Sequence, residues 1–147
     1  MKLIYAMNEL AAAIGMRPVE ADETGGFTLL FDDRHEVSFA PDGDGTVFHA
    51  EVGDVEQLDR ERALSLLEAS LLGAGTGGAA FGVHREFGTV VLWKRFGEFS
   101  SRADLETAIG EFLGQVVAWK GKLSAGGLSA MDSPSGSSPL GESFLQV

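Results

Sequence analysis

Residues 79–96, with the sequence AAFGVHREFGTVVLWKRF, hold the strongest strand pattern in this chain. The first six residues place apolar side chains at alternate positions, as a strand with one buried face does. After a turn at Arg85–Gly88, the run Val90–Trp93 is apolar at successive positions, which is typical of a strand covered on both faces. The stretch therefore predicts a hairpin whose second strand, Thr89–Phe96, lies inside a sheet.

A helix is predicted on each side of this hairpin. On the N-terminal side the helix begins after Asp59, a residue type that caps helices, and it ends at Gly73. Three leucines at helical spacing form a stripe on it: Leu64, Leu67 and Leu71. On the C-terminal side Ser101–Asp104 resembles a capping box with aspartate in the place of glutamate, and apolar residues keep helical spacing as far as Leu123.

The first part of the chain predicts one more helix and three more strands. Residues 2–14 carry apolar side chains on one face of a helix, and Gly15 follows as a C-terminal glycine. Alternation with period two then indicates strands around Phe27–Phe31, Val37–Phe39 and Phe48–Val52, joined by turns rich in Asp and Gly. The predicted order is α-β-β-β-α-β-β-α, an α+β fold in which helices pack on a twisted antiparallel sheet.

The two ends of the chain differ from the rest. Residues 1–123 are predicted to form one domain, and residues 124–147, rich in Ser, Gly and Pro, a flexible tail. Its last residues, Phe144–Val147, are apolar. They are either a docking motif or a segment without a role, and the second interpretation is favoured. At the N-terminus Asn8 and Glu9 interrupt the apolar run, so no signal peptide is predicted and the cytosol is the expected compartment.

Charge and composition limit the partners. The chain has 11 basic and 22 acidic residues, so the formal net charge is −11. Such a surface repels nucleic acid and anionic membranes, and it suits a partner with basic segments. There are no cysteines, which removes disulfides, thiolate catalysis and cysteine-based zinc sites.

The sequence offers no motif for catalysis, a cofactor or a metal. Gly73–Gly78 has the letters of a dinucleotide fingerprint, but a predicted helix precedes it and a strand follows, which is the reverse of what that motif needs. It is predicted to be a flexible link. Asp42–Gly45 hints at a calcium loop, yet the twelfth position is Gly53 and not glutamate, so a polar hairpin turn is predicted. The histidines do not have the spacing of a metal pair: His35, His49 and His84.

In these features the chain resembles the Tir chaperone family, the class I type III secretion chaperones, over roughly residues 1–123. The resemblance rests on the element order and on diffuse local patterns. These are Leu71–Gly78, Phe81–Val83, the turn at Gly88, Val90–Leu92, and the last helix with Phe112, Trp119 and Leu123. Two features depart from the family: the small residues Gly75–Gly78, where larger residues and an asparagine are common, and the Ser/Gly/Pro-rich tail.

The resemblance implies a homodimer that binds an N-terminal segment of a secreted effector in extended form and does not hydrolyse ATP. The segment would add strand pairing at exposed sheet edges and fill apolar patches. The predicted effector contacts are Leu3, Ile4, Met7, Phe27, Leu29, Phe31 and Phe39. The predicted dimer contacts are Leu64, Leu67, Leu71 and Trp93. Trp119 is predicted to belong to the core, and a contact with the secretion ATPase stays open.

Two alternatives remain at this point. YbjN-like proteins share the α+β layout and have a less settled role, and a co-purifying client would favour the chaperone over them. A small enzyme or ligand-binding domain would instead need a concave site with convergent polar groups. No cofactor is expected.

Overall fold

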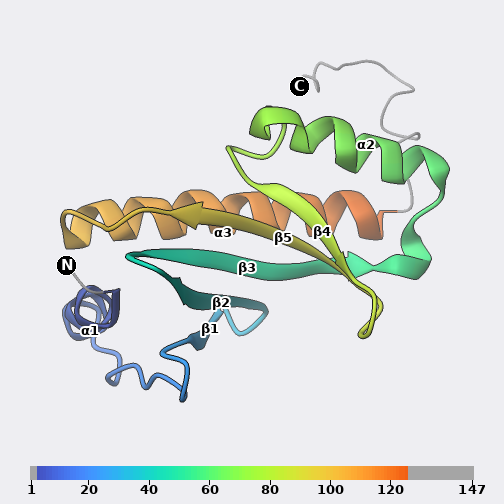
Figure 1. Ribbon diagram of the computed structural model, residues 1–147. Helices are drawn as coiled ribbons and strands as arrows, with labels where there is room; N and C mark the ends of the chain where they lie inside the picture. The colour runs from blue at the N-terminus through green and yellow to red at the C-terminus, as the bar shows by residue number, and fades with distance from the viewer. Residues whose placement is uncertain (1–2, 126–147) are drawn as a thin grey trace. The chain divides into compact units, whose positions relative to one another are not determined.

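The computed structural model describes residues 3–125, and Figure 1 shows their elements. Within this range the predicted order of helices and strands is confirmed. The elements are α1 (Leu3–Ala13), β1 (Phe27–Phe31), β2 (His35–Asp42), β3 (Gly45–Asp54), the short 3-10 turn η1 (Val55–Gln57), α2 (Arg60–Ser70), the 3-10 turn η2 (Leu71–Gly73), β4 (Ala80–His84), β5 (Thr89–Phe96) and α3 (Arg102–Ser124). The tail predicted from residue 124 lies, beyond Ala125, outside the described residues. No helix between residues 3 and 125 is long and apolar enough to cross a bilayer.

The strands form one sheet in the order β1-β2-β3-β5-β4. β1 pairs with β2 in antiparallel register, with Phe27 opposite Phe39, and β2 pairs with β3, with Phe39 opposite Phe48. The prediction that Thr89–Phe96 is an interior strand is confirmed, because β5 has a neighbour on each side. Its coverage is less complete than predicted, since Val90 and Leu92 are fully buried whereas Trp93 is 42% exposed. β1 and β4 are the edge strands.

The chain divides into two compact units that share the long elements β3, β5 and α3. Among the described residues the first unit comprises residues 3–50 and 93–114, and the second comprises residues 51–92 and 115–125. Each is described by itself below.

The core of the first unit is a cluster of phenylalanines centred on Phe48. The Phe48 ring is 0% exposed, and its centroid lies 4.6 Å from Phe39, 4.4 Å from Phe96 and 5.8 Å from Phe112. Phe27 stacks on the far side of Phe39 at 5.0 Å. Helix α1 contributes a buried face of Ala6, Met7 and Ala11. Aromatic pairs in such offset and edge-to-face arrangements stabilise a core beyond the area that they bury.

The turn between β2 and β3 is a polar hairpin, as predicted. Arg95 of β5 donates from Nε to the Asp42 carboxylate over 2.6 Å, and its other nitrogen lies 3.7 Å from the Asp44 carboxylate. The backbone of Gly45 packs so closely on the Phe96 carbonyl that an added Cβ would lie 2.4 Å from that oxygen. The carboxylates that suggested a calcium loop therefore pair with a guanidinium.

His49 predicts a pH dependence of stability. It lies on β3 opposite Ser38 and is half-buried, and this burial lowers its pKa from the ordinary value of 6.5. At pH values between the lowered pKa of the folded state and 6.5, the unfolded chain binds more protons than the folded chain. The free energy of unfolding is therefore unaffected by His49 above pH 6.5, and it falls as the pH decreases through this window. We expect urea midpoints to decrease on acidification below pH 6.5, and His49→Gln to flatten that part of the curve. Identical pH curves for the native protein and the variant would contradict this.

In the second unit α2 lies against β4, and Ser70 connects the two. The Ser70 hydroxyl donates to the Leu66 carbonyl over 2.8 Å and accepts from the Phe81 N–H over 3.0 Å, so it joins helix and strand. Phe81 also packs edge-to-face on Trp119 of α3, with centroids 4.9 Å apart. Trp119 is 4% exposed, which confirms its predicted place in the core.

The prediction that Gly73–Gly78 is a flexible link is wrong. The segment is a compact turn in which the Gly78 N–H donates to the Gly73 carbonyl over 3.0 Å, and the Gly75 N–H donates to the Ala69 carbonyl over 2.9 Å. Thr76 is 1% exposed, and its hydroxyl donates to the Ala79 carbonyl. The glycines permit close backbone contact: Gly73 has φ +70°, and a Cβ there would lie 2.4 Å from the Gly78 Cα. Small residues serve here for tight packing and not for freedom of movement.

Candidate functional site

The predicted effector contacts all belong to the first unit, but they differ in exposure. Met7, Phe27 and Phe39 are buried, at 1%, 8% and 1% exposed, so in the isolated chain they are core residues. Four others are half-buried and so retain surface for a partner: Leu3, Ile4, Leu29 and Phe31. On β1 the odd-numbered residues share one face of the strand, and the strand lies at the edge of the sheet, where Leu29 and Phe31 stay half-buried.

The sequence did not single out several apolar residues that the first unit leaves exposed. Tyr5 on α1 is 63% exposed, Leu30 on β1 is 53%, and Ile14 just after α1 is 61%. Leu30 belongs to the face of β1 opposite to Leu29, and a polar residue is typical at such a position. The signal in the sequence was the adjacent pair Leu29-Leu30, since two neighbours on a strand cannot both face one core.

Two side chains position the start of β1. The side-chain amide oxygen of Asn8 on α1 accepts from the Val19 N–H over 2.7 Å, which ties the connecting segment to the helix. Asp22 then forms a turn, accepting from the Thr24 hydroxyl over 2.7 Å and from the N–H groups of Thr24 and Gly26 over 2.8 and 3.0 Å. The Thr24 hydroxyl first, and the backbone donors after it, lower the pKa of Asp22, because these hydrogen bonds favour the charged carboxylate.

In the second unit α2 has one buried and one exposed apolar face. Its predicted N-cap is confirmed, because the Asp59 carboxylate accepts from the Arg62 N–H over 2.8 Å. Leu66 is the buried residue of the helix, at 5% exposed. The predicted dimer contacts on the helix and directly after it are exposed: Leu64 at 53%, Leu67 at 67%, and Leu71, the first residue of η2, at 67%. We name these three residues the leucine row.

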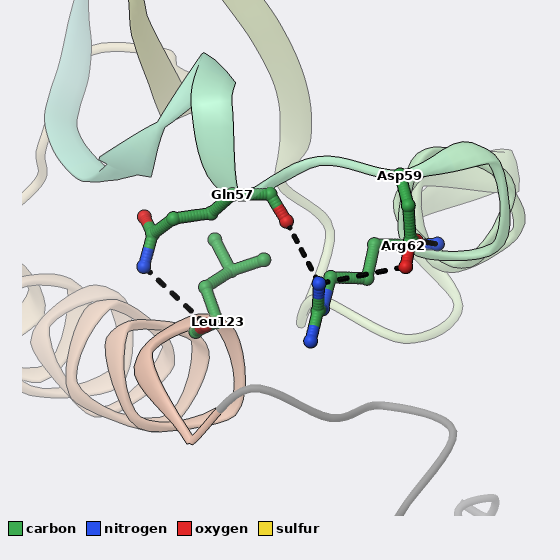
Figure 2. Close-up of polar contacts among 4 residues, drawn as sticks. All are labelled: Gln57, Asp59, Arg62 and Leu123. Atoms are coloured by element: carbon green, nitrogen blue, oxygen red, sulfur yellow. Dashed lines mark hydrogen bonds and ion pairs between the residues drawn. The ribbon is translucent and has the colours of Figure 1, made fainter.

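A polar network fixes the start of α2 (Figure 2). Arg62 donates to the Gln57 carbonyl over 3.0 Å, and the Gln57 amide donates to the Leu123 carbonyl in the last turn of α3 over 3.3 Å. The Gln57 side-chain oxygen also accepts from the Asp54 N–H over 2.6 Å. The Gln57 side chain thus connects the end of β3 with the last turn of α3, and its backbone carbonyl connects both to Arg62 at the start of α2. This network holds α2 by its first turn, within the second unit.

Other exposed apolar residues in the second unit lie near the ends of α2 and β4. Leu72 is 97% exposed, Val83 is 55% and Phe87 is 68%. Phe87 stacks on His84 in the turn between β4 and β5, with centroids 4.4 Å apart. The fourth predicted dimer residue, Trp93, is exposed in the first unit. Exposed apolar side chains such as these on an acidic protein are typical of the class of protein-binding modules.

Comparison with known protein families agrees with this class. The model of the Tir chaperone protein (CesT) family matches residues 6–120. Because this span covers most of the sequence, the chain belongs to the Tir chaperone protein (CesT) family, which is a family of chaperones and not a class of enzymes. No curated protein matches the chain significantly.

Several solved structures share the fold. A chain of the ExsC–ExsE complex aligns with a TM-score of 0.71 at 21% identity, covering 84% of this chain and 97% of the other. The Yersinia pestis type III secretion chaperone SycH, crystallised with a stable fragment of YscM2, gives a TM-score of 0.64 at 17% identity, with 80% and 99% covered. The heterodimeric ExoU–SpcU complex from the type III secretion system of Pseudomonas aeruginosa gives 0.62 at 17% identity, with 82% and 96% covered. At these identities the similarity concerns the fold.

Proposed function

We propose that this protein is a type III secretion chaperone that binds the N-terminal segment of a secreted effector and keeps it soluble and ready for secretion. Family membership carries the proposal, and the structures that share its fold include complexes of chaperones with effectors. The protein acts by binding, without catalysis, in the cytosol. The same proposal includes a homodimer formed through the leucine row and Trp93.

The first unit supplies a surface for an extended client. Among the described residues β1 is an edge strand with β2 as its neighbour, so the N–H and C=O groups along its other edge can pair with a client strand. The half-buried residues on the core-facing side of β1 and on α1 then accept alternate client side chains. Met7, Phe27 and Phe39 contribute by forming the floor of this surface.

Charge near β1 indicates the chemistry of the client. Residues 17–36 contain two arginines and six exposed carboxylates: Glu20, Asp22, Glu23, Asp32, Asp33 and Glu36. A client segment that alternates apolar residues and carries lysine or arginine fits this surface. Its association rate would fall as salt screens the attraction.

The test begins with capture of the client. The tagged protein is incubated with proteins released by its native host under secretion-inducing conditions, and a bound protein is identified and truncated. Binding by an N-terminal segment alone, with two chaperone chains for each client by light scattering, supports the proposal. Binding only to a folded domain, or only to a small molecule, contradicts it and favours the YbjN-like or ligand-binding interpretation.

Leu29→Asp is expected to weaken binding of the captured N-terminal segment at least about tenfold, because it places a charge where an apolar client residue packs. Isothermal titration calorimetry measures the effect. Leu30→Asp is the matched control, since it makes the same change on the opposite face of the same strand. Equal losses for both variants, or a loss only for Leu30→Asp, would contradict the assignment of the core-facing side to the client.

A further inference from the structure

Leu72 combines two features that are each rare for a leucine. It is 97% exposed, more than the other large apolar residues between residues 3 and 125. Its backbone has φ 54° and ψ 20°, in the left-handed region, where the Cβ atom of an L-residue crowds the following carbonyl. Glycine or asparagine is the usual residue in this conformation.

The turn that follows α2 imposes this conformation on Leu72. The Ala74 N–H donates to the Leu71 carbonyl over 3.1 Å, and the hydrogen bonds of Gly75 and Gly78 close the segment behind it. Thr76 anchors the turn in the interior. The backbone of Leu72 is therefore fixed by its neighbours, while almost none of its side chain is covered by its own chain. For the folded monomer a leucine at this position is unfavourable.

We infer that Leu72 is an anchor residue with which the leucine row docks on a second copy of this chain. Leu72 directly follows Leu71, so it extends the exposed row beyond the end of the helix. An unfavourable backbone conformation that positions an exposed apolar side chain indicates a role in binding. The inference rests on the proposed homodimer. It adds that Leu72 is expected to contribute more to the affinity of the dimer than the other leucines of this surface.

The charges of α2 favour a second copy as the occupant. The helix carries Arg60, Glu61, Arg62 and Glu68, and with its N-cap Asp59 it has a net charge of −1, whereas the chain as a whole has a net charge of −11. Two copies can therefore meet at this helix with less repulsion than is expected elsewhere on their surfaces. In an antiparallel pair of helices, Arg60 near the start of one helix lies toward Glu68 near the end of the other, which is a self-complementary arrangement.

The test uses opposite effects of one substitution. Leu72→Gly relieves the left-handed strain, so it is expected to raise the urea midpoint of the monomer, measured in a Leu67→Asp background. The same substitution in the native background is expected to raise the dissociation constant of the dimer at least tenfold, measured by sedimentation equilibrium. Leu72→Asn, which also tolerates this backbone and keeps a side chain of similar length, is expected to weaken the dimer in the same way.

Asp33→Gly is the matched control. Asp33 also has φ 54°, in the turn between β1 and β2, so glycine relieves the same strain there without removing an apolar side chain. It is expected to raise the midpoint and to leave the dissociation constant of the dimer within twofold of the native value.

Four outcomes would overturn the inference. If the Leu72→Gly dimer has the same dissociation constant as the native dimer, then Leu72 is not an anchor residue. A lower midpoint of the monomer shows that Leu72 packs within its own chain. Loss of client binding with an intact dimer assigns Leu72 to the client. A native protein that is monomeric at all concentrations removes the dimer, whereas client capture by its N-terminal segment would still support the chaperone function.

Discussion

Replacing Leu67 with aspartate is expected to convert the dimer into monomers. Leu67 is 67% exposed in the middle of the leucine row, and two copies of it would be buried in a symmetric interface. A carboxylate in an apolar contact loses hydration and gains no partner. We expect the dissociation constant to rise by a factor of about 100 or more, which corresponds to about 3 kcal/mol. Sedimentation equilibrium over a range of concentrations measures it.

The control for Leu67→Asp is Ile14→Asp. Ile14 is similarly exposed, at 61%, and the substitution adds the same negative charge in the first unit, outside the predicted dimer contacts. Its dimer is expected to have the native dissociation constant. If both variants dissociate alike, then net charge and not the leucine row controls assembly; if neither dissociates, the dimer uses another surface.

Phe48→Ala is expected to give the largest loss of stability. Phe48 is completely buried, and its ring contacts four other phenylalanines: Phe39, Phe96, Phe99 and Phe112. Removing such a ring leaves a cavity and costs about 3–5 kcal/mol, a large part of the roughly 5–15 kcal/mol that stabilises a typical domain. Urea unfolding followed by circular dichroism, at one fixed protein concentration, measures the change.

Phe87→Ala is the control for Phe48→Ala. Phe87 is 68% exposed and stacks on His84 in a surface turn, so its removal is expected to change the free energy of unfolding by less than about 0.5 kcal/mol. A small effect at Phe48, or an equal effect at both positions, would contradict the assignment of the aromatic cluster as the core of the first unit.

Much of the candidate site could be predicted because its pattern is local. Leu64 and Leu67 of the leucine row share α2 with the buried Leu66, and the helix therefore has more apolar positions than one buried face can use. Leu72 could not be predicted in the same way, because it lies after the helical periodicity ends. Its left-handed backbone follows from the hydrogen bonds of the turn, which the glycine-rich letters alone suggested to be flexible.

The effector surface shows the same limit. Alternation predicted that Phe39 and Leu29 are both client contacts. Because alternation depends only on neighbouring residues, it does not distinguish which of the two is covered by the rest of the chain. In the structure Phe39 is covered by Phe27 on one side and Phe48 on the other, while Leu29 lies on the edge strand and stays half-buried. Their roles as client contacts remain predictions, with the half-buried residues as the direct ones.

The sequence by itself determined the order of the helices and strands, the N-cap at Asp59 and the interior place of β5, because periodicity and capping depend on residues a few positions apart. Only the tertiary structure decided which apolar residues are covered. Phe48 is buried by Phe96 and Phe112, and Trp119 meets Phe81, in each case across a long stretch of chain. Exposure depends on such distant neighbours, and the surfaces left for partners are therefore a property of the folded chain.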